Sequence, residues 1–399
     1  MQEVSGGVTG PAGFVAGGVA CGVRGEKGLD LGLLYSERPC VSAGVYTRSA
    51  FRGAPLAVTR EAVEAGAVRA VIANSGNANA ATGERGVADA RAMRESAARA
   101  LGVAAGEVAV ASTGVIGERL PVERIEASVP EAAAALGRDG SGFAEAILTT
   151  DTRTKEAAVQ VPLGGGHVTV GGAAKGSGMI HPNMGTMLAF LTTDAAVERE
   201  CLQETLRRAV EVSFNRVTVD GDTSPSDMAL LLANGAAGNE PLTLDSPEYP
   251  AFVEAVEAIT KHLAREIARD GEGATKLVSA SVEGARDEAQ AAALAKAVVG
   301  SSLVKAAIAG EDANWGRVLV AMGYSGAEFE PRDLTLYFGG VKVFAGGEPV
   351  EHDEAEANRA LAADEVEIRA ALAGGGASAT AWGCDLTYEY VRINGSYRT

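Results

Sequence analysis

The stretch KGSGMIHPNMGTMLAFLTTD, residues 175–194, decides how the rest of the chain is interpreted. A loop rich in Gly, Pro and Asn is followed at once by a strand-like apolar run, residues 187–193. Thr186 stands at the junction, directly after Gly185. A cut between these two residues would expose a threonine that carries both a nucleophilic hydroxyl and an amine to activate it. Taken alone, such a junction is more often an ordinary turn into a strand.

Self-cleavage at Thr186 would need further groups. The tetrahedral intermediate formed at the Gly185 carbonyl needs hydrogen-bond donors, which a tight Gly-containing loop supplies. The segment STGVIG, residues 112–117, is such a loop, and it follows a strand-like run at residues 108–111. The freed α-amine of Thr186 would titrate near pH 8, which suits a general base at neutral pH.

Strand-like and helical segments alternate on both sides of this stretch. Such alternation predicts an α/β protein. Strands are expected at 31–35, 41–46, 68–73, 108–111, 187–193, 217–219 and 276–282, and helices at 87–101, 196–212, 247–270, within 287–309 and at 351–372. Two closing strands are expected within 380–393.

Composition narrows the choice of partners. The 399 residues carry a net charge of −17, which argues against nucleic acid or an anionic membrane surface as a partner. The four cysteines and four histidines are scattered without ligand spacing, so we expect free thiols and no metal. Without a signal-like N-terminus or a long apolar run, the chain is expected to be cytoplasmic.

Eight motifs in order connect the chain to a known family. They are NSGNANAATG (74–83), STGVIG (112–117), TTDTRTK (149–155), KGSGMIHPNMGTML (175–188), FNRVTVDGDTSPSD (214–227), DGEGATK (270–276), DANWGR (312–317) and INGSYRT (393–399). Together they resemble the ornithine acetyltransferase family, the self-processing glutamate N-acetyltransferases of arginine biosynthesis. Ala81 replaces the family's usual Cys, and Gly185 replaces its usual Ala, a small residue for a small residue.

The resemblance implies roles for particular residues. Thr186 is implied as the nucleophile of both self-cleavage and acetyl transfer, with Thr113 and Gly114 as the oxyanion hole. The implied substrate-binding residues are Thr152, Lys175, Thr186, Glu272, Asn394 and Thr399. Lys175 suits a substrate carboxylate, and Glu272 suits the ornithine ammonium. Any one of these, seen singly, reads as a surface charge or a turn residue.

The resemblance also implies a reaction and an assembly. A cut would give an α fragment, residues 1–185, and a β fragment, residues 186–399, which includes a smaller C-terminal domain. The β fragment would transfer acetyl from N-acetylornithine to glutamate by a ping-pong route. The implied fold has two β-sheets packed between helix layers, and the implied assembly is an α2β2 heterotetramer. No cofactor is implied, although some members use acetyl-CoA as a co-substrate.

Two other functions stay open at this point. A self-cleaving aminopeptidase or amidohydrolase of the related β-aminopeptidase type would pass the acyl group to water. Its nucleophile is usually serine, and the Asn-rich loop with the INGSYRT terminus favours the transferase. A ligand-binding or scaffold protein without activity would leave the chain uncut.

Overall fold

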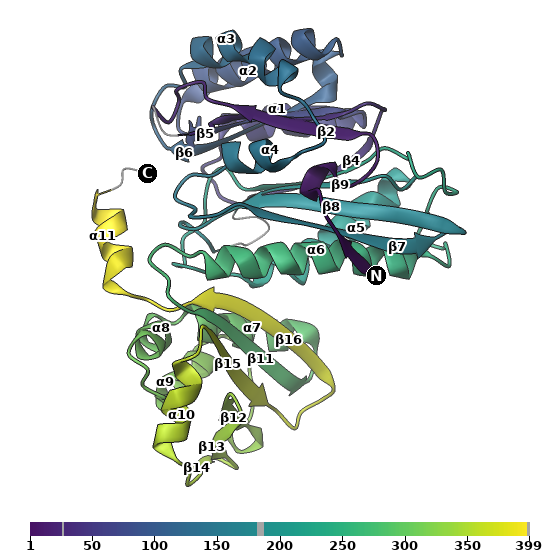
Figure 1. Cartoon of the computed structure of the whole chain (residues 1–399). Helices are drawn as coiled ribbons and strands as arrows, with labels where there is room; N and C mark the ends of the chain where they lie inside the picture. Colours follow the sequence, from purple (N-terminus) through teal and green to yellow (C-terminus); the bar gives the residue numbers. More distant parts are fainter. Residues whose placement is uncertain (26–27, 182–186, 397–399) are drawn as a thin grey trace.

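Two stacked sheets form the N-terminal two thirds of the protein in the computed structural model, which describes residues 1–25, 28–181 and 187–396 (Figure 1). The larger sheet is antiparallel except for its parallel pair β9 and β10. Its strands, in spatial order, are β1 (Gln2–Val4), β7 (Lys155–Leu163), β8 (Gly166–Lys175), β9 (Leu188–Thr193), β10 (Met228–Ala233) and β4 (Val41–Tyr46).

The smaller sheet has four strands and carries the predicted oxyanion loop. In spatial order they are β2 (Phe14–Val19), β3 (Leu31–Ser36), β5 (Ala70–Asn77) and β6 (Val108–Val115). Strands β5 and β6 are parallel, so their carboxyl ends meet at one edge of the sheet. Those ends hold the polar segments NSGN and STGV. The sequence predicts loops at both segments, but the strands continue into them.

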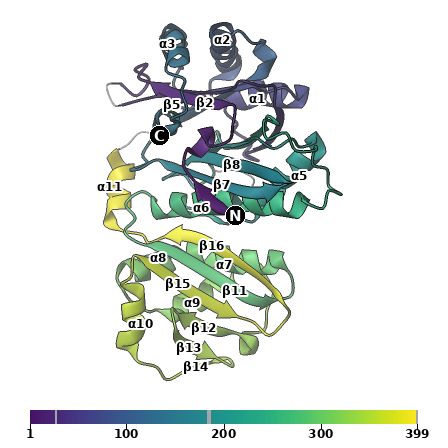
Figure 2. The same ribbon diagram turned by 45° about the vertical axis from the view of Figure 1, so that its right-hand side comes forward.

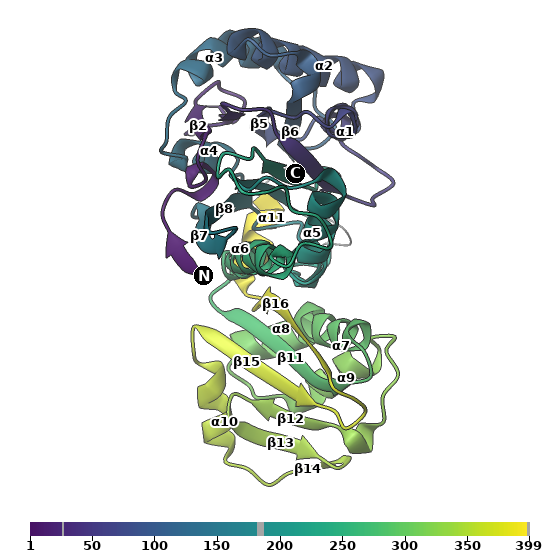
Figure 3. The ribbon, with the colours of Figure 1, turned by 90° about the vertical axis from the view of Figure 1, so that its right-hand side faces the viewer.

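Helices cover the outer faces of both sheets (Figures 1 and 3). Helices α2 (Gly83–Leu101) and α3 (Val122–Ala134) lie outside the smaller sheet, and α5 (Arg199–Glu211) and α6 (Tyr249–Arg269) lie outside the larger one. Helix α6 buries Phe252, Val256, Ile259, Leu263 and Ile267, a spacing of three or four residues that keeps one face on the sheet.

A third apolar core fills the space between the sheets. Phe190 of β9 meets Phe143 there, with ring centroids 5.2 Å apart. Helix α4 (Ser141–Ala146), which contains Phe143, contacts strands of both sheets, and α1 (Ala54–Ala65) packs against β6 and β4. Short 3-10 turns occur at Gly7–Thr9, Ala105–Glu107, Phe214–Arg216 and Pro331–Asp333. The predicted arrangement of two sheets between helix layers is confirmed.

The C-terminal third forms a smaller α/β domain with its own sheet and core (Figure 2). Its strands, in spatial order, are β14 (Glu348–Pro349), β13 (Val341–Ala345), β12 (Thr335–Phe338), β15 (Glu365–Ala371), β11 (Leu277–Ala285) and β16 (Ala377–Cys384). Its helices are α7 (Glu288–Gly300), α8 (Ser302–Ala309), α9 (Trp315–Gly323) and α10 (Glu354–Leu361). A final helix, α11 (Tyr388–Ser396), runs from this domain back beside the stacked sheets (Figure 1).

Four sequence predictions need correction. The helix expected over 351–372 ends at Leu361, and the rest is strand β15, whose buried residues alternate as a strand requires. The second of the two closing strands is helix α11 instead. Residues 217–219 form only an isolated bridge, Val217 to Trp382. The Ala-rich helix is broken at Ser301, whose side chain caps α8 by accepting from the N–H of Val304.

Among the described residues, no single helix is long and apolar enough to cross a membrane, although α7 and α8, bent by 56° at their junction, pass the same test as a pair.

Candidate active site

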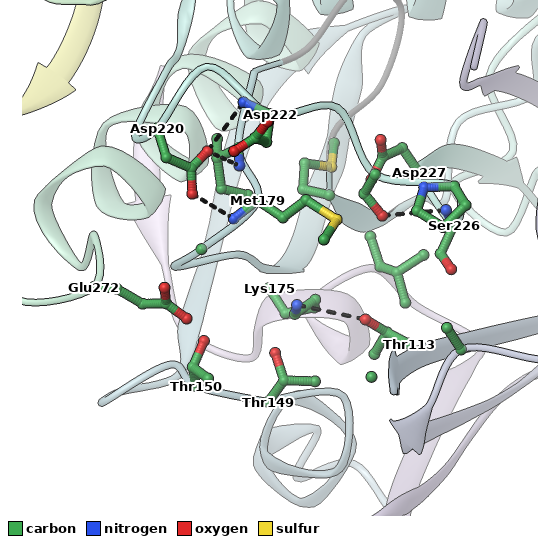
Figure 4. Close-up of a pocket in the computed structure, with 18 of the residues that line it drawn as sticks. Thr113, Thr149, Thr150, Lys175, Met179, Asp220, Asp222, Ser226, Asp227 and Glu272 are labelled. Carbon is green, nitrogen blue, oxygen red and sulfur yellow. Dashed lines mark hydrogen bonds between the residues drawn. The ribbon is translucent and has the colours of Figure 1, made fainter. Parts of the chain in front are cut away.

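A pocket of about 180 Å³ opens where strand ends of the two sheets meet (Figure 4). It is lined from the smaller sheet by Thr113 and Gly114, and from the larger sheet by Lys175, at the end of β8, and Leu188, at the start of β9. Met187, the residue directly after Thr186, also lines it. The remaining lining residues are Ala78, Ile116, Thr149, Thr150, Gly178, Met179, Ile180, Asp220, Asp222, Ser224, Pro225, Ser226, Asp227, Glu272, Tyr390 and Asn394.

The Thr113–Gly114 segment is held in an unusual backbone conformation. Gly114 has a φ of 129°, and a Cβ added there would lie 2.3 Å from the carbonyl carbon of Gly76 on the paired strand. Only glycine fits such a position. Because Gly114 has no side chain, its backbone itself forms part of the pocket wall. Backbone N–H groups in a tight loop of this kind are suited to stabilise an oxyanion.

Lys175 is the one cation among the described residues that line the pocket. Its side chain is buried, and its Nζ lies 3.5 Å from the hydroxyl oxygen of Thr113. Burial lowers the pKa of Lys175, and the nearby charge of Asp151 opposes that shift. A buried ammonium of this kind is suited to pair with a ligand carboxylate.

A buried ion network lies behind Lys175 and fixes the turn that follows it. The ammonium of Lys155 lies 2.7 Å from Asp151 Oδ1 and 2.6 Å from Asp270 Oδ2. The N–H of Gly176 donates to Asp151 Oδ1 at 2.7 Å. Although burial would raise the pKa of Asp151, the charges of Lys155 and then Lys175 hold it well below its usual range. The Asp151 carboxylate therefore stays charged and, through its hydrogen bond from Gly176, anchors the end of β8.

Thr152 belongs to this network and does not line the pocket. Its hydroxyl and its N–H both donate to the carboxylate of Asp270. The predicted contact of Thr152 with substrate therefore stays a prediction.

Glu272 and Asn394 meet at the opposite end of the pocket. The side-chain amide of Asn394 donates to Glu272 Oε2 at 2.7 Å, and the N–H of Glu272 donates to the carbonyl of Ser177 at 2.9 Å. A Cβ on Gly178 would lie 2.2 Å from the carboxyl carbon of Glu272, so the turn after Lys175 must pass close to this carboxylate. Thus DGEGATK, KGSG and the C-terminal motif, far apart in sequence, converge as the predicted binding residues require.

Asp220 fixes the chain just before residues 182–186. Its carboxylate accepts from the N–H groups of Met179, at 2.7 Å, and Ile180, at 2.9 Å (Figure 4). It also accepts from the hydroxyl of Tyr390 at 3.3 Å. His181 follows, with its Nδ1 3.0 Å from the Thr218 hydroxyl. Burial lowers the pKa of His181 to about 4, so the ring is neutral at pH 7.

Three predicted residues, Gly185, Thr186 and Thr399, lie outside the described residues. The structure describes their neighbours: Met187 lines the pocket, and Asn394 on α11 reaches it.

Asp220 and Asp227 were missed as individual site residues. Both belong to the motif 214–227, and Asp227 directly precedes the apolar strand β10. An acidic residue at a strand end was the available signal.

The fold and the pocket together define a class of enzyme. Its members have two stacked sheets between helix layers and a polar pocket at the strand ends, beside the start of β9. The family model described as the ArgJ family matches residues 15–399. The chain therefore belongs to the ArgJ family.

Relatives and solved structures agree with this membership. The chain is 55% identical over 402 residues to the arginine biosynthesis bifunctional protein ArgJ of Symbiobacterium thermophilum, with 100% of both chains covered. It is 51% identical over 400 residues to the protein of that name from Bacillus subtilis, covering 100% of this chain and 98% of the relative. A crystal structure of ArgJ from Bacillus halodurans is 47% identical with a TM-score of 0.52, and covers 53% of this chain and 100% of its own.

Proposed function

We propose that the chain transfers an acetyl group from N-acetylornithine to glutamate through an acetyl ester on Thr186. As a member of the ArgJ family it is an enzyme of arginine biosynthesis of the ornithine acetyltransferase type, and not a hydrolase of the β-aminopeptidase type. The observation that carries the mechanism is the position of Met187. The residue covalently joined to Thr186 lines the same pocket as Thr113, Gly114 and Lys175.

The nucleophile is generated by a cut between Gly185 and Thr186, which leaves fragments 1–185 and 186–399. The β fragment has 214 residues, 399 minus 185. The Bacillus halodurans chain, matched over its full length, covers 53% of this chain, or about 211 residues, close to the length of such a fragment. Both fragments contribute to the pocket, Thr113 and Lys175 from the first and Glu272 and Asn394 from the second. The fragments therefore act as one unit.

Acetyl transfer follows in two steps. The amine of Thr186 takes the proton of its own hydroxyl, whose oxygen attacks the acetyl carbonyl of N-acetylornithine. Thr113 and Gly114 stabilise the resulting oxyanion, and one such donor is typically worth about 3 kcal/mol of the barrier. Ornithine leaves, and glutamate then attacks the ester and removes the acetyl group.

The charged groups of the pocket match the substrates. Lys175 pairs with the α-carboxylate and Glu272 with the side-chain ammonium of N-acetylornithine. Asn394 orients Glu272, which supports a role at this end of the pocket. Thr152 and Thr399 complete the proposed contacts with the acyl amino acid.

The assembly and setting are proposed on resemblance alone: an α2β2 heterotetramer of cytoplasmic enzyme, with no bound cofactor. The bifunctional name of the relatives supports a second reaction, in which acetyl-CoA supplies the acetyl group to glutamate.

An acceptor assay tests the proposal. Enzyme with N-acetylornithine and glutamate should release ornithine and N-acetylglutamate in equal amounts. Ornithine release without N-acetylglutamate would instead identify a hydrolase. Replacing N-acetylornithine by acetyl-CoA in the same assay decides between one activity and two.

A further inference from the structure

Asp227 is a buried carboxyl in the pocket wall, outside the set of residues assigned above. It is 2% exposed and directly precedes β10. The next residue, Met228, pairs in parallel register with Leu188, and its N–H donates to the carbonyl of Met187 at 2.9 Å. Asp227 therefore lies beside Met187, directly before the start of strand β9.

One carboxyl oxygen of Asp227 has no hydrogen-bond partner within the described part of the chain. Its Oδ2 is buried and unpaired among the described residues, whereas two other pocket carboxylates, Asp220 and Glu272, accept hydrogen bonds from the protein. A buried carboxyl oxygen without a partner costs free energy unless a ligand or a proton satisfies it. Among the described pocket residues, Asp227 is thus the one with a buried carboxyl oxygen that no hydrogen bond satisfies.

The surroundings of Asp227 favour its protonated form. Burial raises the pKa of Asp227 well above its ordinary value, against the opposing effects of a hydrogen bond from Ser224 and the charge of Lys175. A carboxyl that is protonated more readily than an exposed aspartate can act as a general acid, and its ionised form as a general base.

Acetyl transfer between two amino acids that are ammonium ions when free also moves one ammonium proton, which such a group can carry. The nitrogen of the departing ornithine must gain a proton to leave as an ammonium ion. The α-ammonium of the arriving glutamate must lose a proton before its nitrogen can attack. The amine of Thr186 handles only the proton of its own hydroxyl, so this further proton needs another carrier.

Resting on the proposed function, we propose that Asp227 carries one proton between the two half-reactions, from the ammonium of arriving glutamate to the amine of departing ornithine. In the first half-reaction, the bond between the acetyl group and the ornithine nitrogen breaks, and the ester to Thr186 forms. The hydroxyl proton passes to the departing nitrogen, and the Asp227 carboxyl supplies the second proton. In the second, the Asp227 carboxylate takes a proton from glutamate, the new N–acetyl bond forms, and the Thr186 oxygen regains a proton from the attacking nitrogen. The Asp227 carboxyl and the Thr186 hydroxyl are then both protonated again, as they were at the start.

The variant Asp227→Asn tests this role because it keeps the shape of the side chain and removes the exchangeable proton. We would acetylate the enzyme with p-nitrophenyl acetate, whose leaving group needs no proton. The acetyl-enzyme would then be offered either glutamate or hydroxylamine, whose nitrogen is largely uncharged at neutral pH. Transfer to glutamate should fall about 100-fold or more, the usual share of general acid–base catalysis, while transfer to hydroxylamine stays within about threefold of wild type.

A matched control is Asp89→Asn, which removes a buried aspartate of helix α2 that is paired with Arg85 and lies away from the pocket. It should leave both transfers unchanged. Equal loss with both acceptors, or no loss with glutamate, would overturn the role of Asp227. An Asp227→Asn chain that stays uncut would also overturn it, because the carboxyl would then act in cleavage. A wild-type enzyme that acetylates hydroxylamine but never glutamate would reject the proposed function itself.

Discussion

The side-chain amide of Asn394 donates a hydrogen bond of 2.7 Å to Glu272, and so ties helix α11 to one end of the pocket. This contact joins residues 122 positions apart in the chain. It fixes the direction of the Glu272 carboxylate, as an ammonium-binding group requires.

Glu272→Ala should therefore weaken substrate binding without stopping cleavage. Loss of a charge-assisted hydrogen bond worth about 1.5–3 kcal/mol predicts a Michaelis constant for N-acetylornithine raised roughly 10- to 100-fold. Self-cleavage, followed by gel electrophoresis during expression, should slow far less. The control is Glu389→Gln, a half-buried residue of α11 that pairs with Arg392 and does not line the pocket. Equal effects of Glu272→Ala on cleavage and on binding would contradict an ammonium-binding role.

Gly114→Ala tests the oxyanion segment. A Cβ at a φ of 129° and 2.3 Å from Gly76 would force β5 and β6 apart. We expect a loss of roughly 3 kcal/mol or more in the free energy of unfolding, together with loss of transfer. Gly117→Ala is the comparison, because that glycine also has a positive φ but open space around it. Similar unfolding curves for the two variants in urea would show that the close approach to Gly76 is unimportant.

Lys155→Met tests the buried network. It would leave Asp151 and Asp270 buried without their shared ammonium, and breaking such a network typically costs about 3–5 kcal/mol. Lys261→Met removes an exposed lysine that pairs with Glu257, and should change stability by less than about 1 kcal/mol. Urea titration of both variants measures the difference, and a Lys155 variant as stable as the Lys261 variant would contradict the assignment.

His181 should make the free energy of unfolding depend on pH. Its pKa is lowered from 6.5 to about 4 in the folded protein, so between these pH values the unfolded chain binds more protons than the folded one. The stability that this neutral histidine contributes is therefore complete above pH 6.5 and declines as pH falls toward 4. Unfolding free energies of wild type and His181→Asn, measured across this range, should converge as the pH decreases. A constant difference between them would show that the pKa is not lowered.

Particular residues show how much of the fold could be predicted from the sequence. Periodicity was sufficient for α6, where Phe252, Val256 and Ile259 mark one buried face. Periodicity failed at β15, where buried Val366 and Ile368 alternate with exposed residues. No turn signal separates this strand from helix α10, which precedes it. Local pattern fails completely for α11, which buries none of its own residues in the body of the protein.

The helix α11 is positioned by long-range contacts that no local window contains. They include the Thr387 hydroxyl donating to the Gly273 carbonyl at 2.7 Å, and the bond from Asn394 to Glu272. The functional site shows the same difference between residues that the sequence predicts and residues that only the structure reveals. Motif resemblance named Thr113, Lys175, Glu272 and Asn394, which meet in one pocket, whereas Asp227 emerged only once its burial and its unpaired oxygen were visible.

The central claim is that Thr186, freed by a cut after Gly185, carries the acetyl group. Mass spectrometry of the purified protein, incubated with N-acetylornithine in the absence of glutamate, tests it directly. We predict two fragments, residues 1–185 and 186–399, with one acetyl group on Thr186 of the second that disappears when glutamate is added. A single uncut chain, or an acetyl group that persists when Thr186 is replaced by alanine, would contradict the account.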